Sequence, residues 1–156
     1  MNPQNKNTDK YVLHPDQCKF IYNIAYLSLF SSLYATYNKL YLLACCPGGV
    51  FITSIYYWKN PTFDSPRRYI DIGCLSVALG YQIYIAYYSQ YIALYYSIML
   101  CAVSFYPLGY FFYNRNLYWK STYAHCMIHI LANIGNVFLY SGEFNYNKQC
   151  INRLDI

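Results

Sequence analysis

The charged residues are spaced so that long uncharged stretches lie between them. Residues 20–38, 40–58, 72–114 and 121–142 contain no Asp, Glu, Lys or Arg. A helix needs about 20 residues, mostly apolar, to cross the hydrocarbon core of a bilayer, which is roughly 30 Å thick. The third stretch is about twice that length, so it must fold back on itself. The pattern therefore predicts membrane-crossing helices.

The predicted domain spans residues 18–142 and is a multi-pass, all-α transmembrane helix bundle. We predict the reversal inside the longest stretch near Ser89 and Gln90, which tyrosines flank. Helix is the expected structure throughout, because lipid cannot satisfy unpaired backbone polar groups. The five predicted helices cover residues 18–37, 40–58, 69–88, 91–113 and 124–142. Residues 1–17 and 143–156 are polar and are predicted to be flexible tails.

The second predicted helix contains Pro47, Gly48 and Gly49 near its middle. Proline lacks a backbone donor and disturbs a helix interior, and glycine weakens it. One alternative is a kinked helix that still crosses the membrane. The other is a split helix, which would reduce the number of crossings to four.

The composition agrees with a membrane protein. Hydrophobic residues make up 57% of the chain and charged residues 11%, whereas about 25% charged residues is usual in soluble domains. The 23 tyrosines lower the mean hydropathy, although their rings are largely apolar and suit the membrane interface. Seven cysteines without metal-site spacing are interpreted as small hydrophobic residues.

Lysine and arginine residues are distributed unevenly between the two predicted sides. With five crossings, eight fall on the side of the N-terminus, and three, Lys39, Lys148 and Arg153, on the other. Basic residues favour the cytosolic side. The N-terminus is therefore predicted to be cytosolic and the C-terminus outside or lumenal. This bias also accounts for the net charge of +5, and no nucleic-acid-binding motif is present.

A small set of polar side chains lies within the predicted helices. His125 and His129 are four residues apart, so they share one helix face, which Asn133 and Asn136 continue. Asp71 begins the third helix on the same predicted side of the membrane. Ionisable groups are costly in a bilayer, so each requires a partner or a function.

Two interpretations of this set are open. In the first, Asp71, His125 and His129 form a polar cluster that holds helices together by hydrogen bonds. In the second, His125 and His129 are metal ligands, and Asp71 is a third ligand or orients a histidine. Zinc would then lower the pKa of a bound water to about 7, and Ser54 could hold a water or a substrate oxygen. A pair between Arg68 and Asp71 would leave the aspartate with no functional role.

These residues resemble a family pattern. Ser54-x-x-x-Trp58, Asp71 and His125-x-x-x-His129 are similar, in order and spacing, to the motif of the alkaline ceramidase and progestin/adiponectin receptor superfamily. That family has seven membrane helices, and several members are zinc-dependent lipid amide hydrolases. The resemblance implies Ser54 and Asp71 as catalytic residues and His125 and His129 as zinc ligands. The family's first histidine falls at Trp58, and two family helices are missing.

The sequence predicts, first, a non-enzymatic multi-pass membrane protein with a polar cluster in the cytosolic half of its bundle. The alternative is a ceramidase-like, zinc-dependent hydrolase of lipid amides, and a transporter or channel subunit ranks third. No cofactor other than this zinc is indicated. The expected partners are the lipid bilayer and further copies of the chain. The segments 56–61 and 67–71 also resemble small multi-pass proteins of large DNA viruses, which implies a host or virion membrane.

Overall fold

The computed structural model describes residues 12–145, which form a bundle of helices with no strand in that range. The helices are α1 (Pro15–Ile24), α2 (Tyr26–Tyr37), α3 (Tyr41–Trp58), α4 (Pro66–Ala86), α5 (Ile92–Asn114) and α6 (Tyr118–Ser141). The all-α bundle predicted from the sequence is confirmed. Residues of the predicted tails before 12 and after 145 lie outside the described range.

Five rods result, because α1 and α2 follow one another and are separated only at Ala25. There the hydrogen bonding tightens, since the amide of Ser28 donates to the carbonyl of Ala25 at 3.0 Å, three residues back. The predicted single helix of residues 18–37 is therefore two helices. The first begins at Pro15, where the Gln17 side chain accepts a hydrogen bond from the backbone of His14 at 3.0 Å.

The helix α3 runs through Pro47 without interruption, so the split that the sequence left open is wrong. Proline removes the hydrogen bond that would reach the carbonyl of Leu43. Next to it, the hydroxyl of Ser32 on α2 donates to the carbonyl of Ala44 at 2.8 Å. A Cβ atom placed on Gly48 would lie 2.9 Å from that hydroxyl. The glycine thus permits close packing of α2 on α3.

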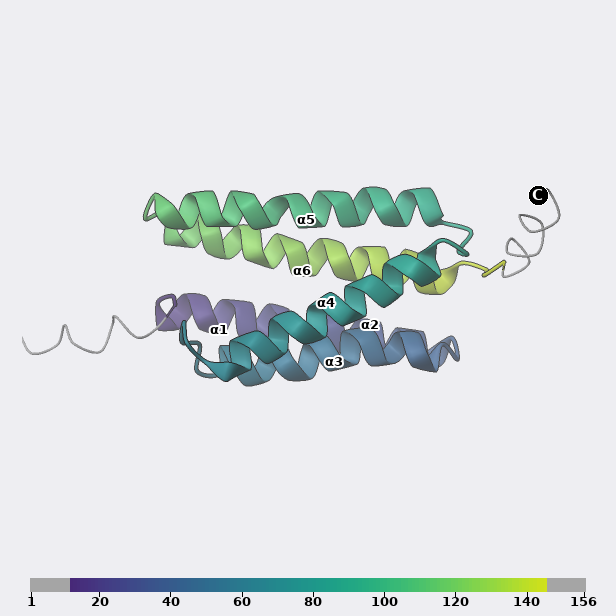
Figure 1. Cartoon of the computed structure of the whole chain (residues 1–156), viewed down its shortest axis with the longest axis horizontal. Coiled ribbons are helices and arrows are strands. Elements are labelled where there is room, and N and C mark those ends of the chain that lie inside the picture. Colours follow the sequence, from purple (N-terminus) through teal and green to yellow (C-terminus); the bar gives the residue numbers. More distant parts are fainter. Residues whose placement is uncertain (1–11, 146–156) are drawn as a thin grey trace, which may run out of the picture.

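The rods form two antiparallel pairs that α4 connects. In Figure 1, α5 lies along α6 on one side, α1 and α2 lie along α3 on the other, and α4 runs diagonally between the pairs. Further contacts join α2 to α6 and α3 to α4. The largest core cluster includes Leu43, Tyr95, Leu139 and Tyr140, which come from α3, α5 and α6.

Successive rods run in opposite directions, so the connections gather at two ends (Figure 1). One end holds the start of α1, the α3–α4 loop and the α5–α6 loop; the other holds the α2–α3 and α4–α5 loops and the end of α6. The predicted turn near Ser89 and Gln90 lies in the α4–α5 loop. The amide of Gln90 donates to the carbonyl of Glu143 at 2.9 Å, which fastens this loop to the chain after α6.

Three helices, α3, α4 and α5, are long and apolar enough to cross a membrane. Their outward faces carry large apolar side chains. Leu42 on α3, Val77 on α4 and Leu100 on α5 are each 73–75% exposed. Such surfaces are unusual in a soluble monomer but suit contact with lipid.

Candidate functional site

The polar face predicted for α6 points into the bundle. Asn133 and Asn136 are both buried, and both are bonded to other helices. The side-chain oxygen of Asn133 accepts a hydrogen bond from the Ser31 hydroxyl of α2 at 2.5 Å. Its amide nitrogen donates to the hydroxyl of Ser28 at 3.4 Å and to the carbonyl of His129 at 2.7 Å. This part of α6 is therefore tied to α2.

A second connection joins α6 to α4. The side-chain amide of Gln82 donates to the oxygen of Asn136 at 2.9 Å and to the hydroxyl of Tyr140 at 2.6 Å. All three side chains are buried. We refer to Ser28, Ser31, Gln82, Asn133, Asn136 and Tyr140 as the central polar network. Buried polar groups are stable when they are hydrogen-bonded, and each member of this network has a partner in another helix.

Towards the end of the bundle that holds the α3–α4 and α5–α6 loops, the candidate residues form two groups rather than one cluster. In the first group, Oδ1 of Asp71 on α4 accepts hydrogen bonds from the hydroxyls of Thr53 at 2.7 Å and Ser54 at 2.9 Å, both on α3. The structure therefore brings together Ser54 and Asp71, two of the candidate site residues. Thr53 was not predicted, although a hydroxyl next to Ser54 in an apolar helix was a visible signal.

The second group consists of His125 and His129 on α6, whose ring centroids lie 5.1 Å apart. The ring of Trp58, from the end of α3, lies 5.2 Å from that of His125 in an edge-on arrangement. Nε2 of His125 is buried and has no hydrogen-bond partner among the described residues. At the position where the resemblance places the family's first histidine, the chain therefore has a tryptophan ring in contact with His125.

These two groups do not provide the three ligands of a catalytic zinc site. Among residues 12–145, no group of three or more His, Cys, Asp or Glu side chains is arranged to hold a metal ion. The Asp71 oxygen is bonded to Thr53 and Ser54, and tryptophan offers no metal ligand at the position of the family's first histidine. The residues present do not fit the zinc centre that the resemblance implies, because a catalytic zinc needs three protein ligands.

The arginines near Asp71 have other partners. The guanidinium of Arg67 lies over the ring of Tyr56, 4.3 Å from its centroid, and Arg68 donates to the carbonyl of Phe63 at 3.4 Å. The only ion pair in the described part of the chain joins His14 and Asp16. The suggested pair between Arg68 and Asp71 is therefore wrong.

Comparison with known proteins adds no relative. No protein-family model matches the chain, and neither a curated protein nor a solved structure matches it significantly.

Proposed function

We propose that the chain is a multi-pass integral membrane protein with a structural, non-enzymatic role, in which the central polar network holds α6 against α2 and α4. The supporting observation is that Asn133 and Asn136 are buried and bonded to two different helices. Within a bilayer the hydrophobic effect does not drive helices together, so interhelical hydrogen bonds and close packing determine their association.

In this proposal five segments cross the membrane: α1 with α2 as one, then α3, α4, α5 and α6. The helices α1 and α2 are each too short to cross alone, and α6 owes its lower hydropathy to its polar face, which the bundle shields from lipid. The basic end is cytosolic. Six described basic residues lie there and one, Lys39, lies at the opposite end; the six are Lys19, Lys59, Arg67, Arg68, Arg115 and Lys120.

The number of crossings is tested by placing reporters at the C-terminus. Five crossings with a cytosolic N-terminus put the C-terminus outside. In a bacterial host, an alkaline phosphatase fused to the C-terminus is then active. A fluorescent protein fused there is dark, because it does not become fluorescent after export through the general secretion route. The reverse pair of signals would contradict the proposed topology.

The structural role is tested by measuring the stability of the folded protein, which requires no assay of activity. Replacing both Asn133 and Asn136 by alanine should lower the thermal unfolding temperature of the detergent-solubilised protein, because Ser28 and Ser31 lose their partner and Gln82 keeps only its bond to Tyr140. Asn23 is exposed on α1 and provides the control, since Asn23→Ala removes no side-chain partner. Equal unfolding temperatures for all three proteins would reject the proposal.

A ceramidase-like hydrolase is the second candidate, and two observations favour it. Ser54, which the resemblance implies as catalytic, is hydrogen-bonded to Asp71, and Nε2 of His125 is buried without a partner among residues 12–145. Elemental analysis of the purified protein beside a His125→Ala/His129→Ala variant decides between the candidates. Stoichiometric zinc that disappears in the variant would support the hydrolase, whereas we expect no zinc in either protein.

A further inference from the structure

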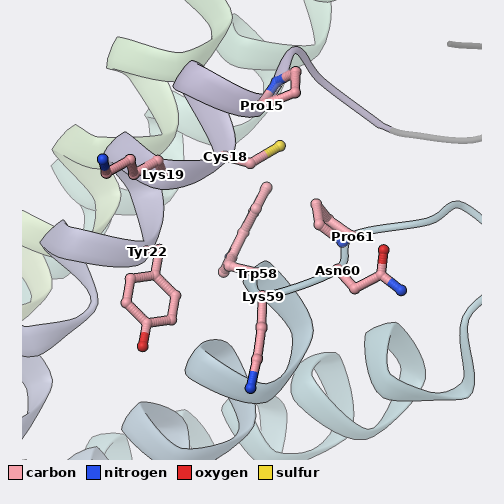
Figure 2. Close-up of a pocket in the computed structure, with 8 residues that line it drawn as sticks. All are labelled: Pro15, Cys18, Lys19, Tyr22, Trp58, Lys59, Asn60 and Pro61. Carbon is pink, nitrogen blue, oxygen red and sulfur yellow. The ribbon is translucent and has the colours of Figure 1, made fainter.

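A cavity of about 340 Å³ opens at the basic end of the bundle, away from the central polar network. It lies between the start of α1 and the turn that follows α3. Figure 2 shows that two lysines border it from different segments, Lys19 from α1 and Lys59 just after α3, with Tyr22 and Trp58 between them and the two ammonium groups extending away from one another. Its volume is at the small end of the range for ligand pockets, roughly 300–1,000 Å³.

The charges of this cavity are of one sign. Among residues 12–145, no acidic side chain lines it. Within the described part of the chain, neither Lys19 nor Lys59 has a carboxylate partner, because the single ion pair there joins His14 and Asp16. Two unneutralised ammonium groups beside a hollow favour an anion. The amide side chain of Asn60 adds a polar group at the rim.

The walls of the cavity are those of a membrane-interface site. Trp58 is buried, and its ring forms the inner wall, while Tyr22 is half-buried. Tryptophan and tyrosine are enriched at the level of lipid headgroups. Anionic lipids are concentrated in the cytosolic leaflet, where they attract basic residues. The proposed topology places this end of the bundle in that leaflet.

We propose that this cavity binds the anionic headgroup of a phospholipid from the cytosolic leaflet, with Lys19 and Lys59 on either side of the phosphate and Trp58 against the lipid backbone. Because Trp58 also packs on His125, the bound lipid would join α1, α3 and α6 at this end. The inference rests on the proposed membrane topology.

The chain contains two tryptophans, Trp58 and Trp119. A Trp119→Phe background therefore makes the fluorescence of Trp58 a report on this cavity alone. The protein is reconstituted in phosphatidylcholine vesicles that contain a minor fraction of brominated lipid, either phosphatidylcholine or phosphatidylserine. Bromine quenches nearby tryptophan, so the two degrees of quenching measure the local enrichment of each lipid.

We expect brominated phosphatidylserine to quench Trp58 about twofold more than brominated phosphatidylcholine at equal mole fraction, because two flexible lysine side chains border the cavity and can reach a headgroup bound there. The Lys19→Gln/Lys59→Gln variant should lose this preference. Lys39→Gln, at the opposite end of the bundle, is the matched control and should retain it. An unchanged thermal unfolding temperature in the double variant shows that its fold is intact.

Three outcomes would overturn the inference. Equal quenching by both lipids in the parent means that the cavity does not select an anionic headgroup. A preference that persists in the double variant places the selection elsewhere. A preference that excess inorganic phosphate abolishes identifies a site for a soluble anion. Absence of quenching by either lipid is a different result, since it would place Trp58 away from the bilayer and contradict the proposed topology itself.

Discussion

Two polar regions lie along α6, and they are satisfied to different degrees. In the central polar network, Asn133 and Asn136 have partners on α2 and α4. Near the basic end, Nε2 of His125 is buried with no partner in the described structure. A buried polar atom without a hydrogen bond costs stability, and a bonded one contributes to it. The same helix face thus combines a stabilising region with a destabilising one.

This difference assigns separate roles to the regions. The central network accounts for helix association without any ligand. In the region near His125, the imidazole contacts the ring of Trp58. Its buried imidazole nitrogen, unpartnered among the described residues, lowers stability, and proteins retain such unfavourable features mainly at functional sites. Substitutions in the two regions should therefore change the free energy of unfolding with opposite signs.

The largest effect is expected at Asn133. Asn133→Ala removes the partner of Ser28 and Ser31, so we expect the free energy of unfolding to fall by about 2 kcal/mol. Thermal or denaturant unfolding in a mild detergent measures the change. The exposed Asn23→Ala serves as the control. A loss no larger than that of the control would mean that the central network does not stabilise the bundle.

Packing next to the network gives the second effect. A Cβ atom on Gly48 would lie 2.9 Å from the Ser32 hydroxyl, so Gly48→Ala should disturb the contact of α2 with α3 and cost roughly 1–2 kcal/mol. A Cβ atom on Gly80 meets no atom within 4 Å.

The variant Gly80→Ala is thus the matched control, and it should be neutral or stabilising because alanine favours helix. Unfolding of the two variants under the same conditions measures the contrast. A destabilised Gly80→Ala with an unaffected Gly48→Ala would show that α2 and α3 do not pack closely at this point.

His125 should give a smaller effect of the opposite sign. His125→Phe retains a ring against Trp58 and His129 but removes the unpartnered Nε2 atom. We expect the free energy of unfolding to rise by up to about 1 kcal/mol. The same unfolding assay detects it, with Tyr123→Phe, an exposed position on α6, as the control. A clear loss of stability would mean that His125 has an essential partner.

Asp71 should show the smallest change. Thr53 and Ser54 both donate to Oδ1 of Asp71, and the side-chain oxygen of asparagine can accept the same two bonds. Asp71→Asn should therefore alter the free energy of unfolding by less than about 0.5 kcal/mol, whereas Asp71→Leu leaves both hydroxyls without an acceptor and should cost more. Equal losses in both variants would show that the negative charge itself is required.

The positions of the helices could be predicted because charged residues mark their ends. Lys39 lies between α2 and α3, and Arg115 lies between α5 and α6, as the uncharged stretches indicated. The interruption at Ala25 left no such mark, since its neighbours are as apolar as a continuous helix requires. Continuity of α3 through Pro47 was also not predictable, because a proline inside a helical stretch can either kink the helix or end it.

The candidate site could be predicted only in part. The four-residue spacing of His125 and His129 defined one face of α6, and that face does point inward. The partners of this face were not predictable, because Ser28, Ser31 and Gln82 are ordinary polar residues until the packing of α2 and α4 brings them to it.

The most direct test of the central claim is a double-mutant cycle between Gln82 on α4 and Asn136 on α6. Gln82→Leu, Asn136→Leu and the double variant are compared with the parent by unfolding in detergent. If the 2.9 Å hydrogen bond between these side chains holds the two helices together, the coupling energy should be about 0.6–1.7 kcal/mol. A coupling energy of zero would contradict the account. In that case the losses in free energy of unfolding of the two single variants would add up to the loss of the double variant.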